Sequence, residues 1–370
     1  MPSSRLHQLS DLGQSVWIDY LSRDLLETGE LARLIEEDAV VGVTSNPTIF
    51  QRAIAGGSAY DGQLAELSGE VRDPKKLFYE LAAHDVATAS DLLIPIWKAT
   101  SGRDGYVSWE VDPNFADDRR SSFEEAQHLH AWIDRPNLYV KIPATTAGVG
   151  AIEDMVAAGK NINVTLIFSL QRYREVVEAY INGLERLVAD GGDPATVHSV
   201  ASFFVSRVDT ETDKRLDAIG GHAALKGKLG IANAKLAYQH YLNAFAGDRW
   251  ERLASEGATT QRCLWASTST KDPAYSDVMY VEGLIGPETV NTMPEETIRA
   301  FQDHGRVAQT MTQGLNDARR LFDELEDAGV DYGDVVATLE REGIEKFTAS
   351  FADLLEGVHD KAYTLVTMDG

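Results

Sequence analysis

The sequence predicts an α/β fold, a (β/α)8 TIM barrel with additional helices. Short apolar runs rich in β-branched and aromatic residues recur along the chain, as expected of buried strands. Longer stretches with apolar residues at helical spacing lie between them, and this alternation is typical of parallel sheets. Eight such runs favour a closed barrel, with a doubly wound open sheet as the alternative. The chain has 370 residues, more than the roughly 250 of a typical barrel, so insertions are expected.

The candidate strands are bounded by Gly, Pro, Asn or Asp, which favour turns. In chain order they span residues 16–20, 41–45, 106–111, 138–143, 163–168, 197–204, 262–267 and 279–284. Two of the intervening stretches, residues 75–99 and residues 170–189, have apolar residues at clear helical spacing. Each of these two stretches is therefore predicted to be a helix.

Three segments exceed a minimal barrel. Residues 226–254 are expected to form one or two helices, and residues 289–357 a long helical tail. Residues 60–74 are expected to form a polar loop with a short helical pattern. No linker rich in Pro, Gly or Ser divides the sequence. We therefore expect residues 1–370 to form a single barrel domain with a helical C-terminal extension.

The composition excludes several classes of partner. Asp and Glu number 58 against 34 Lys and Arg, which gives a net charge of −24. Such a charge argues against nucleic acid or an anionic membrane as the main partner, but a local cluster of cations can still bind a small anion. The sequence has no signal-peptide pattern and no run of 18 apolar residues. A cytoplasmic location is expected by elimination.

Cofactor and metal motifs are not found. Cys263 is the single cysteine, so it fits no metal-site spacing and is expected in the core. His128 and His130 are two residues apart in a helical stretch and face different sides. Neither GxGxxG after a strand nor GxxxxGK[ST] occurs. No cofactor and no metal are therefore expected, so the chemistry must come from side chains.

Polar residues interrupt the apolar runs, mostly toward their C-terminal ends. These ends form the active-site face of a (β/α)8 barrel. The residues concerned are Asp19, Thr44, Asn46, Glu110, Lys141, Asn163, Thr165, Ser202, Arg207 and Ser267. We expect these side chains to meet at one end of the barrel.

Lys141 is the main candidate nucleophile. Its neighbours are Tyr139, Val140, Ile142 and Pro143, and an unpaired ammonium in such surroundings costs several kcal/mol. A neutral amine there would attack a carbonyl and form an imine. An interior ion pair with a carboxylate, or a side chain that extends to solvent, is the structural alternative.

Asp19 and Glu110 are candidate acid and base groups. Imine chemistry requires proton transfers at nitrogen, at the carbinolamine hydroxyl and at the hydroxyl beside the cleaved bond, all of which carboxylates can perform. Structural salt bridges are the alternative for both residues. Arg207 and Lys271 are candidate phosphate ligands, because barrels often hold phosphate after their last strands. The alternative for Arg207 is a surface ion pair with Asp209 or Glu211. The alternative for Lys271 is a solvated position in a loop.

Four segments together resemble the transaldolase family. Gly42–Pro47 resembles the signature after the second strand, and Asn137–Ala144 the signature that holds the Schiff-base lysine. Val107–Asp112 resembles the stretch with the catalytic glutamate, and Asn161–Ser169 the fifth-strand motif. The resemblance covers nearly the whole chain, and its length is similar to the longer actinobacterial and cyanobacterial branch. It implies a barrel of the class I aldolase type.

The resemblance implies a role for each catalytic candidate. Lys141 would form the imine with the ketose donor, and Glu110 would act as acid and base through a water held by Thr165. Asp19 would take and return the proton at the cleaved bond. The implied reaction moves dihydroxyacetone from sedoheptulose 7-phosphate to glyceraldehyde 3-phosphate, giving erythrose 4-phosphate and fructose 6-phosphate in the non-oxidative pentose phosphate pathway.

The resemblance also implies the substrate contacts. Asn46 and Ser202 would bind hydroxyls of the dihydroxyacetone unit, and Arg207 would bind phosphate. The partners implied are therefore sugar phosphates, and relatives include monomers and homodimers.

The sequence departs from the family at one phosphate position. Many members have a second arginine two residues after the serine that matches Ser267, and Ser269 stands there in this chain, with Lys271 as a substitute. Small aldolases of the same family have Gln at the position of Glu110 and Tyr at that of Phe204, so both residues here favour transfer. An aldolase that releases dihydroxyacetone, and a non-catalytic sugar-phosphate-binding barrel, are the alternatives.

Overall fold

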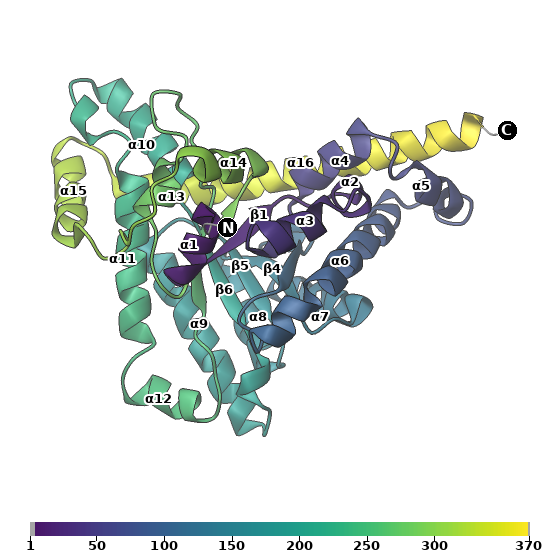
Figure 1. The fold of residues 1–370 in the computed structure, drawn as a ribbon, viewed down its shortest axis with the longest axis horizontal. Helices are drawn as coiled ribbons and strands as arrows, with labels where there is room; N and C mark the ends of the chain where they lie inside the picture. Colours follow the sequence, from purple (N-terminus) through teal and green to yellow (C-terminus); the bar gives the residue numbers. More distant parts are fainter. Residues whose placement is uncertain (1–3, 369–370) are drawn as a thin grey trace.

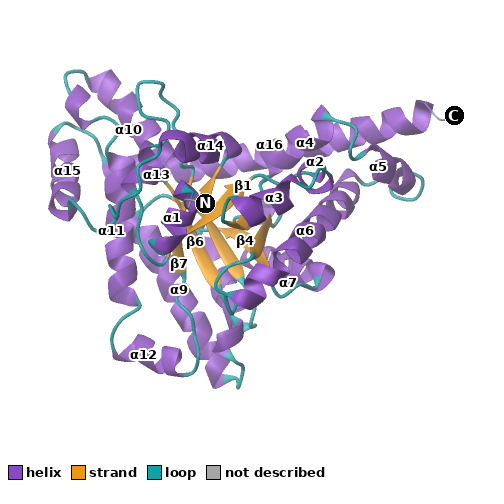
Figure 2. Ribbon diagram, viewed as in Figure 1, coloured by secondary structure: helices purple, strands orange, loops and turns teal. Residues whose placement is uncertain are grey.

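The computed structural model describes residues 4–368 and contains a closed barrel of parallel strands in sequential order (Figure 2). Strand β1 pairs with β2 on one side and closes the barrel against β8 on the other. The strands are β1 (Gln14–Asp19), β2 (Val40–Thr44), β3 (Tyr106–Glu110), β4 (Leu138–Pro143), β5 (Ile162–Ile167), β6 (Ser199–Phe204), β7 (Arg262–Ala266) and β8 (Thr289–Met293). The predicted (β/α)8 TIM barrel is confirmed, and the open sheet is wrong.

The predicted position of the eighth strand is wrong. Residues 279–284 form the short helix α13 (Met279–Gly283), and β8 follows in what was expected to be a helical tail. β8 has the sequence Thr-Val-Asn-Thr-Met, so its apolar signature is weak although the whole strand is buried. Two of its side-chain oxygens accept hydrogen bonds there: Gln14 Nε2 donates to Thr289 Oγ1 over 3.0 Å, and Thr268 Oγ1 donates to Asn291 Oδ1 over 3.0 Å, while Asn291 Nδ2 has no partner among the described residues. Hydrogen bonding allows these polar residues to be buried, which a hydrophobicity pattern does not detect.

Helices surround the barrel (Figures 1 and 2). The two helices with clear spacing are present as α6 (Pro74–Ala99) and α9 (Leu170–Ala189), and residues 226–254 contain α11 (Leu229–Ala244) and α12 (Asp248–Ser255). The other helices before β8 are α1 (Arg5–Asp11), α2 (Arg23–Glu27), α3 (Glu30–Glu37), α4 (Pro47–Gly56), α5 (Asp61–Ser68), α7 (Arg119–Ile133), α8 (Thr146–Ala157) and α10 (Ser206–Ile219). After β8 come α14 (Glu295–His304), α15 (Leu315–Asp327) and α16 (Tyr332–Met368). Short 3₁₀ turns are η1 (Pro113–Phe115), η2 (Pro194–Thr196) and η3 (Ala223–Leu225).

Several strands are followed closely by a capped helix. Asn46, Thr145 and Ser169 are the N-caps of α4, α8 and α9, and each side chain accepts a hydrogen bond from a backbone N–H of the first turn. Such caps satisfy amide groups that the helix cannot pair itself. The caps therefore fix where the chain turns from strand to helix beside the C-terminal ends of β2, β4 and β5.

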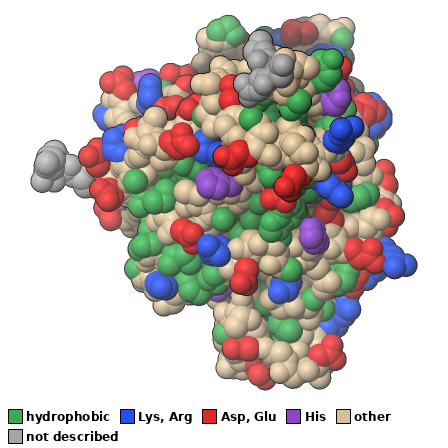
Figure 3. Space-filling view, turned by 90° about the vertical axis from the view of Figure 1, so that its right-hand side faces the viewer, with side chains coloured by type: hydrophobic (Ala, Val, Ile, Leu, Met, Phe, Trp, Pro, Cys, Tyr) green, Lys and Arg blue, Asp and Glu red, His purple; other side chains and the backbone are tan. Residues whose placement is uncertain are grey.

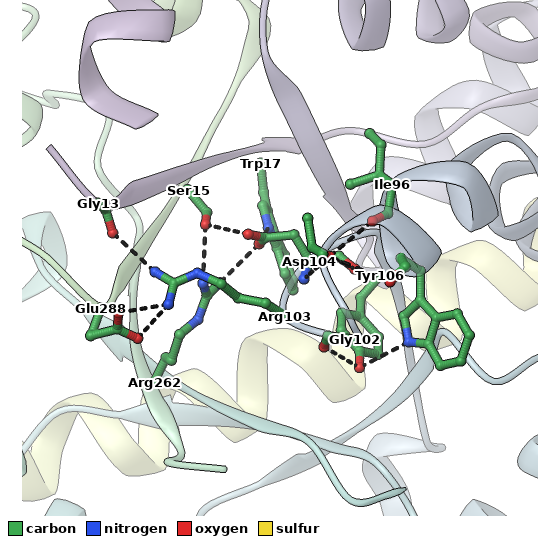
Figure 4. A network of polar contacts seen from close by, with 12 residues as sticks. Gly13, Ser15, Trp17, Ile96, Gly102, Arg103, Asp104, Tyr106, Arg262 and Glu288 are labelled. Carbon is green, nitrogen blue, oxygen red and sulfur yellow. Dashed lines mark hydrogen bonds and ion pairs between the residues drawn. The ribbon is translucent and has the colours of Figure 1, made fainter. Parts of the chain in front are cut away.

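A buried polar network closes the N-terminal end of the barrel (Figure 4). Arg262 Nη2 lies 2.9 Å from Asp104 Oδ1, and both side chains are less than one-tenth exposed. Ser15 Oγ donates to Asp104 Oδ2 over 2.8 Å and accepts from Arg262 Nη1 over 3.1 Å. Beside this pair, Arg103 and Glu288 form an ion pair of 2.6 Å that is well exposed. Hydrogen-bonded side chains thus fill the interior of the barrel at this end.

Helix α16 is 37 residues long and runs along the molecule to the C-terminus (yellow in Figure 1). It packs against α4, α5, α6 and α10, and it also contacts β5. Thr48 Oγ1 of α4 donates to Ser350 Oγ of α16 over 2.9 Å, and Lys361 Nζ lies 2.7 Å from Asp61 of α5. The last helix is thus attached to segments from the first part of the chain.

One face of the molecule is mixed in charge (Figure 3). On the face shown in Figure 3, acidic side chains alternate with Lys and Arg, so the net negative charge is not gathered in one patch there. No helix within residues 4–368 is both long enough and apolar enough to cross a membrane.

Candidate active site

A cavity of about 170 Å³ lies at the C-terminal ends of the strands. All the polar residues predicted to meet here line it except Glu110 and Asn163, and they come from β1, β2, β4, β5, β6 and the segments after β2, β6 and β7. The lining residues are Asp19, Thr44, Asn46, Lys141, Thr165, Ser202, Phe204, Arg207, Ala266, Ser267, Ser269, Lys271, Thr292, Pro294 and Phe347. Residues spread over most of the sequence are therefore brought to one site.

Lys141 lines this cavity with its side chain only 7% exposed. Its Nζ is 2.6 Å from Glu110 Oε1 and donates to the carbonyl oxygen of Ser45 over 2.9 Å. β3 and β4 are paired so that Glu110 and Lys141 are direct neighbours across the strands. The interior ion pair that was the structural alternative for Lys141 is thus present, but Lys141 also faces the cavity.

Glu110 lies behind Lys141 and not in the main cavity. It lines a separate void of about 10 Å³ together with Trp109, Phe78 and Phe351. Burial raises the pKa of Glu110, and the charge of Lys141 opposes the shift. The carboxyl group can therefore exchange protons with Lys141 while it is shielded from solvent.

Asp19 occupies the C-terminal end of β1, on the cavity wall. Its Oδ1 accepts a hydrogen bond of 2.8 Å from Thr44 Oγ1, which lies 2.6 Å from Thr292 Oγ1. Burial raises the pKa of Asp19, and Lys141 followed by the Thr44 hydroxyl opposes this rise. A carboxyl group with a raised pKa is suited to general acid and base catalysis.

Thr165 is positioned by an irregularity in β5. Leu166 has φ +58°, a left-handed conformation that is unfavourable for leucine, and the pairing of β5 with β6 shifts register between Val164 and Ile167. Thr165 Oγ1 is buried on the cavity and has no hydrogen-bond partner among the described residues. Strained backbone at such a position is typical of functional sites.

The two predicted hydroxyl-binding residues each use one polar group within the protein. Asn46 Oδ1 accepts from the N–H of Ile49 over 3.1 Å, so the amide NH2 of Asn46 is the group left for the cavity. Ser202 Oγ donates to Asn163 Oδ1 over 2.7 Å, so its oxygen lone pairs remain available as acceptors. Both side chains are therefore fixed in orientation.

Arg207 is not engaged by the carboxylates that follow it. Asp209 accepts from Gly230 and Tyr280, and Glu211 pairs with Lys214 and Arg215, so a surface ion pair with Arg207 is wrong. The Arg207 guanidinium lies over the Phe204 ring, 5.0 Å from its centre. Burial lowers the pKa of Arg207, and the charges of Asp19 and Glu110 oppose the shift.

The segment after β7 supplies the other polar groups at the predicted phosphate end. Ser267, with φ +55°, has its Oγ 2.8 Å from Ser206 Oγ, and Lys271 Nζ donates to Ser269 Oγ over 2.7 Å. Lys271 is exposed, which agrees with the solvated loop position that was its alternative, and it also lines the cavity. Arg207, Ser267, Ser269 and Lys271 thus offer two cations and two hydroxyls to a bound anion.

Sequence reasoning missed several lining residues. Thr292 was hidden because β8 was not detected, and Phe347 lies in the middle of α16, where its helical context gives no sign of a site. Ser269 was noted for its departure from the family pattern, without a place in the site. Thr44 was predicted to lie at this end of the barrel as a polar residue at a strand end, but no role in the site was assigned to it.

Within residues 4–368, no group of three or more His, Cys, Asp or Glu side chains is placed to hold a metal ion. Cys263 is buried in the core, and its Sγ lies 3.1 Å from the Tyr173 hydroxyl. Its location agrees with the predicted core position. The polar groups at the cavity are amine, carboxyl, hydroxyl, amide and guanidinium.

Comparison with known proteins confirms the predicted family. The model of the family described as transaldolase/fructose-6-phosphate aldolase matches residues 16–358. A transaldolase of Renibacterium salmoninarum is 49% identical over 97% of both chains. Transaldolases of an Arthrobacter species and of Mycobacterium tuberculosis are 51% and 50% identical, each over 95% of both chains.

These relatives match nearly the whole length of the chain, and the family match runs from within β1 to the last helix, so it covers most of β1 and all of the other strands. The chain belongs to the transaldolase/fructose-6-phosphate aldolase family.

Proposed function

We propose that the chain is a transaldolase that uses Lys141 to carry a dihydroxyacetone unit from sedoheptulose 7-phosphate to glyceraldehyde 3-phosphate. The products are erythrose 4-phosphate and fructose 6-phosphate, and the reaction belongs to the non-oxidative pentose phosphate pathway. The observation that carries the proposal is the position of Lys141, which faces the cavity and lies 2.6 Å from Glu110. A buried amine with an adjacent proton acceptor is the arrangement that imine formation requires.

The first step is formation of the imine. Glu110 takes a proton from the Lys141 ammonium, and the free amine adds to the carbonyl carbon of the ketose to give a carbinolamine. Protonation of the carbinolamine hydroxyl by Glu110, through a water bound to Thr165, releases water and leaves the imine. Support comes from the closeness of Glu110 to Lys141 and from the Thr165 hydroxyl, which faces the cavity.

The second step breaks the carbon–carbon bond. Asp19 accepts the proton of the hydroxyl on the fourth carbon, the bond between the third and fourth carbons breaks, and its electrons move toward the imine to form an enamine. The aldehyde product leaves, and the acceptor aldehyde takes its place. The enamine then attacks the acceptor carbonyl while Asp19 returns the proton. Support comes from Asp19 on the cavity wall, fixed by Thr44.

Substrate contacts follow from the groups that remain available. The Asn46 NH2 donates to a hydroxyl of the dihydroxyacetone unit, and Ser202 Oγ accepts from another. Arg207, Ser267 and Lys271 bind the phosphate at the other end of the sugar. The proposal includes a cytoplasmic location and a monomer or homodimer, without nucleic acid or membrane as partners.

An aldolase that releases free dihydroxyacetone is the nearest alternative. The acidic side chain at Glu110 and the apolar ring at Phe204 favour transfer, because the small aldolases of the family have Gln and Tyr there. Product formation with and without an acceptor aldehyde separates the two activities. A non-catalytic binding barrel is disfavoured, since a binder has no use for a buried lysine beside a carboxyl group.

Trapping with borohydride tests the proposal. Incubation with fructose 6-phosphate and borohydride should label the wild-type chain at Lys141, and Lys141→Ala should remove the label while circular dichroism shows a folded protein. Lys160→Ala is the control and should be labelled as the wild type is, because Lys160 lies at the other end of the barrel. Normal labelling of Lys141→Ala would rule out Lys141 as the imine lysine.

A further inference from the structure

The segment of residues 267–278, which we call the phosphate loop, joins β7 to α13 without regular secondary structure. Its beginning is attached to the barrel, because Thr268 Oγ1 donates to the Thr292 carbonyl over 3.1 Å and the Ser206 N–H donates to the Ser267 carbonyl over 2.9 Å. Residues 271–274, which include Lys271, are all exposed. A further attachment is therefore needed to hold Lys271 near the cavity.

Helix α10 provides that attachment with two carboxylates one turn apart. Asp213 Oδ2 accepts a hydrogen bond of 2.6 Å from the Tyr275 hydroxyl, and Asp213 Oδ1 accepts one of 2.9 Å from the N–H of Gly227. Asp209 makes the same kind of bridge, from the N–H of Gly230 (2.7 Å) to the Tyr280 hydroxyl (2.9 Å). Both ends of the segment from Tyr275 to Tyr280 are thus fastened to α10.

The packing around Tyr275 shows that its ring is closely fitted. Gly227 has φ +66°, and a Cβ atom there would lie 2.7 Å from Tyr275 Cζ. Glycine is required both by the left-handed conformation and by the close approach of the ring. The ring therefore lies against the turn before α11, which holds its hydroxyl toward Asp213.

We propose that Tyr275 and Asp213 are positioning residues that hold Lys271 of the phosphate loop at a fixed place relative to Arg207, and so set the affinity for phosphorylated substrates. Arg207 lies in the first turn of α10, and Asp213 lies on the same helix. The hydrogen bond between Tyr275 and Asp213 therefore connects the loop that carries Lys271 to the helix that carries Arg207. The inference rests on the proposed function, because it refines how that site recognises a phosphate.

The physical effect is one of preorganisation. Without the Tyr275 hydroxyl bond, the segment between Ser267 and Tyr275 has more conformations, and binding of phosphate by Lys271 must restrict them. The affinity for phosphorylated ligands should therefore fall, while the chemistry at Lys141 should not change. We therefore expect a change in KM without a change in kcat.

Tyr275→Phe tests the inference, since it removes one oxygen atom and keeps the ring. KM for fructose 6-phosphate should rise about two- to fivefold, the range expected when an exposed charge contact is weakened. The value of kcat should stay unchanged, as should kcat/KM for dihydroxyacetone, which has no phosphate. In a Lys271→Ala background, Tyr275→Phe should have no additional effect on KM.

Tyr180→Phe is the matched control. It removes a hydroxyl that donates to the Thr259 carbonyl over 2.7 Å, before β7 at the opposite end of the barrel, so KM should not change. Three results would each overturn the inference: an equal fall in kcat/KM for phosphorylated and unphosphorylated donors, an unchanged KM for fructose 6-phosphate, or the same rise in KM in the Lys271→Ala background. Trapping of wild-type protein at Lys141 is measured separately, so failure of the proposed function is distinguishable from failure of this inference.

Discussion

The amine of Lys141 and the carboxyl group of Glu110 are 2.6 Å apart, yet Lys141 lines the substrate cavity and Glu110 does not. Glu110 is closed off by aromatic rings behind Lys141. This arrangement gives the amine a proton acceptor that substrate does not displace. It also means that substitution of Glu110 should affect proton transfer at Lys141 and spare substrate binding.

We predict that Glu110→Gln slows formation of the trapped adduct by a factor of about 10² to 10⁴, the usual contribution of a general acid or base. The amide keeps the shape of the side chain but cannot take a proton from Lys141. Rapid-quench trapping with fructose 6-phosphate gives the rate, and KM reports binding. A normal trapping rate would show that another group takes the proton.

The second prediction concerns Arg207 and Lys271, the two cations proposed to bind phosphate. Arg207→Ala should raise KM for phosphorylated donors about tenfold or more, because a shielded, charge-assisted contact is strong. Lys271→Ala should raise it about two- to fivefold, because Lys271 is exposed and provides a point charge. Steady-state kinetics with fructose 6-phosphate and with dihydroxyacetone provide the comparison. Equal losses on both donors would remove the phosphate role of the residue concerned.

The sequence predicted seven of the strands and most of the site for one physical reason. Charged or polar residues such as Asp19 and Lys141 stand out when they interrupt apolar runs, and strand ends gather at one face of a barrel. β8 was missed because Asn291 and Thr292 are buried with hydrogen-bond partners, so the strand lacks an apolar pattern. Phe347 could not be predicted, because it reaches the cavity only through the tertiary packing of α16.

Other features depend on contacts between distant residues. Tyr275 and Asp213 are 62 positions apart, and Asp104 and Arg262 are 158 apart. In neither pair does the sequence around one residue specify the other. The relative placement of such pairs follows from the closure of the barrel and could be read only from the structure.

The third prediction concerns the network at the N-terminal end of the barrel (Figure 4). Asp104→Asn should lower the free energy of unfolding by about 3–5 kcal/mol, because it leaves the Arg262 charge buried without its counter-ion. Glu288→Gln is the control, since its pair with Arg103 is exposed and should contribute less than about 1 kcal/mol. Urea unfolding followed by circular dichroism measures both. Similar small losses in the two variants would show that the buried pair adds little stability.

The last prediction separates Asp19 from Glu110. The two carboxyl groups are proposed to act in different steps, so removal of each should stop the enzyme at a different intermediate. Asp19→Asn leaves Glu110 and Lys141 in place, and the imine should still form. The amide cannot accept the proton of the hydroxyl on the fourth carbon, so the bond beside it should not break.

Asp19→Asn should therefore accumulate the imine of the intact donor, and borohydride should trap an adduct with the mass of the whole sugar. The wild-type enzyme, which completes cleavage, should yield the three-carbon adduct. Thr44→Val gives a graded comparison, because it removes the hydroxyl that donates to Asp19 over 2.8 Å and keeps the carboxyl group. Its cleavage should be slowed less than that of Asp19→Asn. Mass spectrometry of the adducts decides the assignment, since a three-carbon adduct on Asp19→Asn would mean that cleavage proceeds without this carboxylate and that another group accepts the proton.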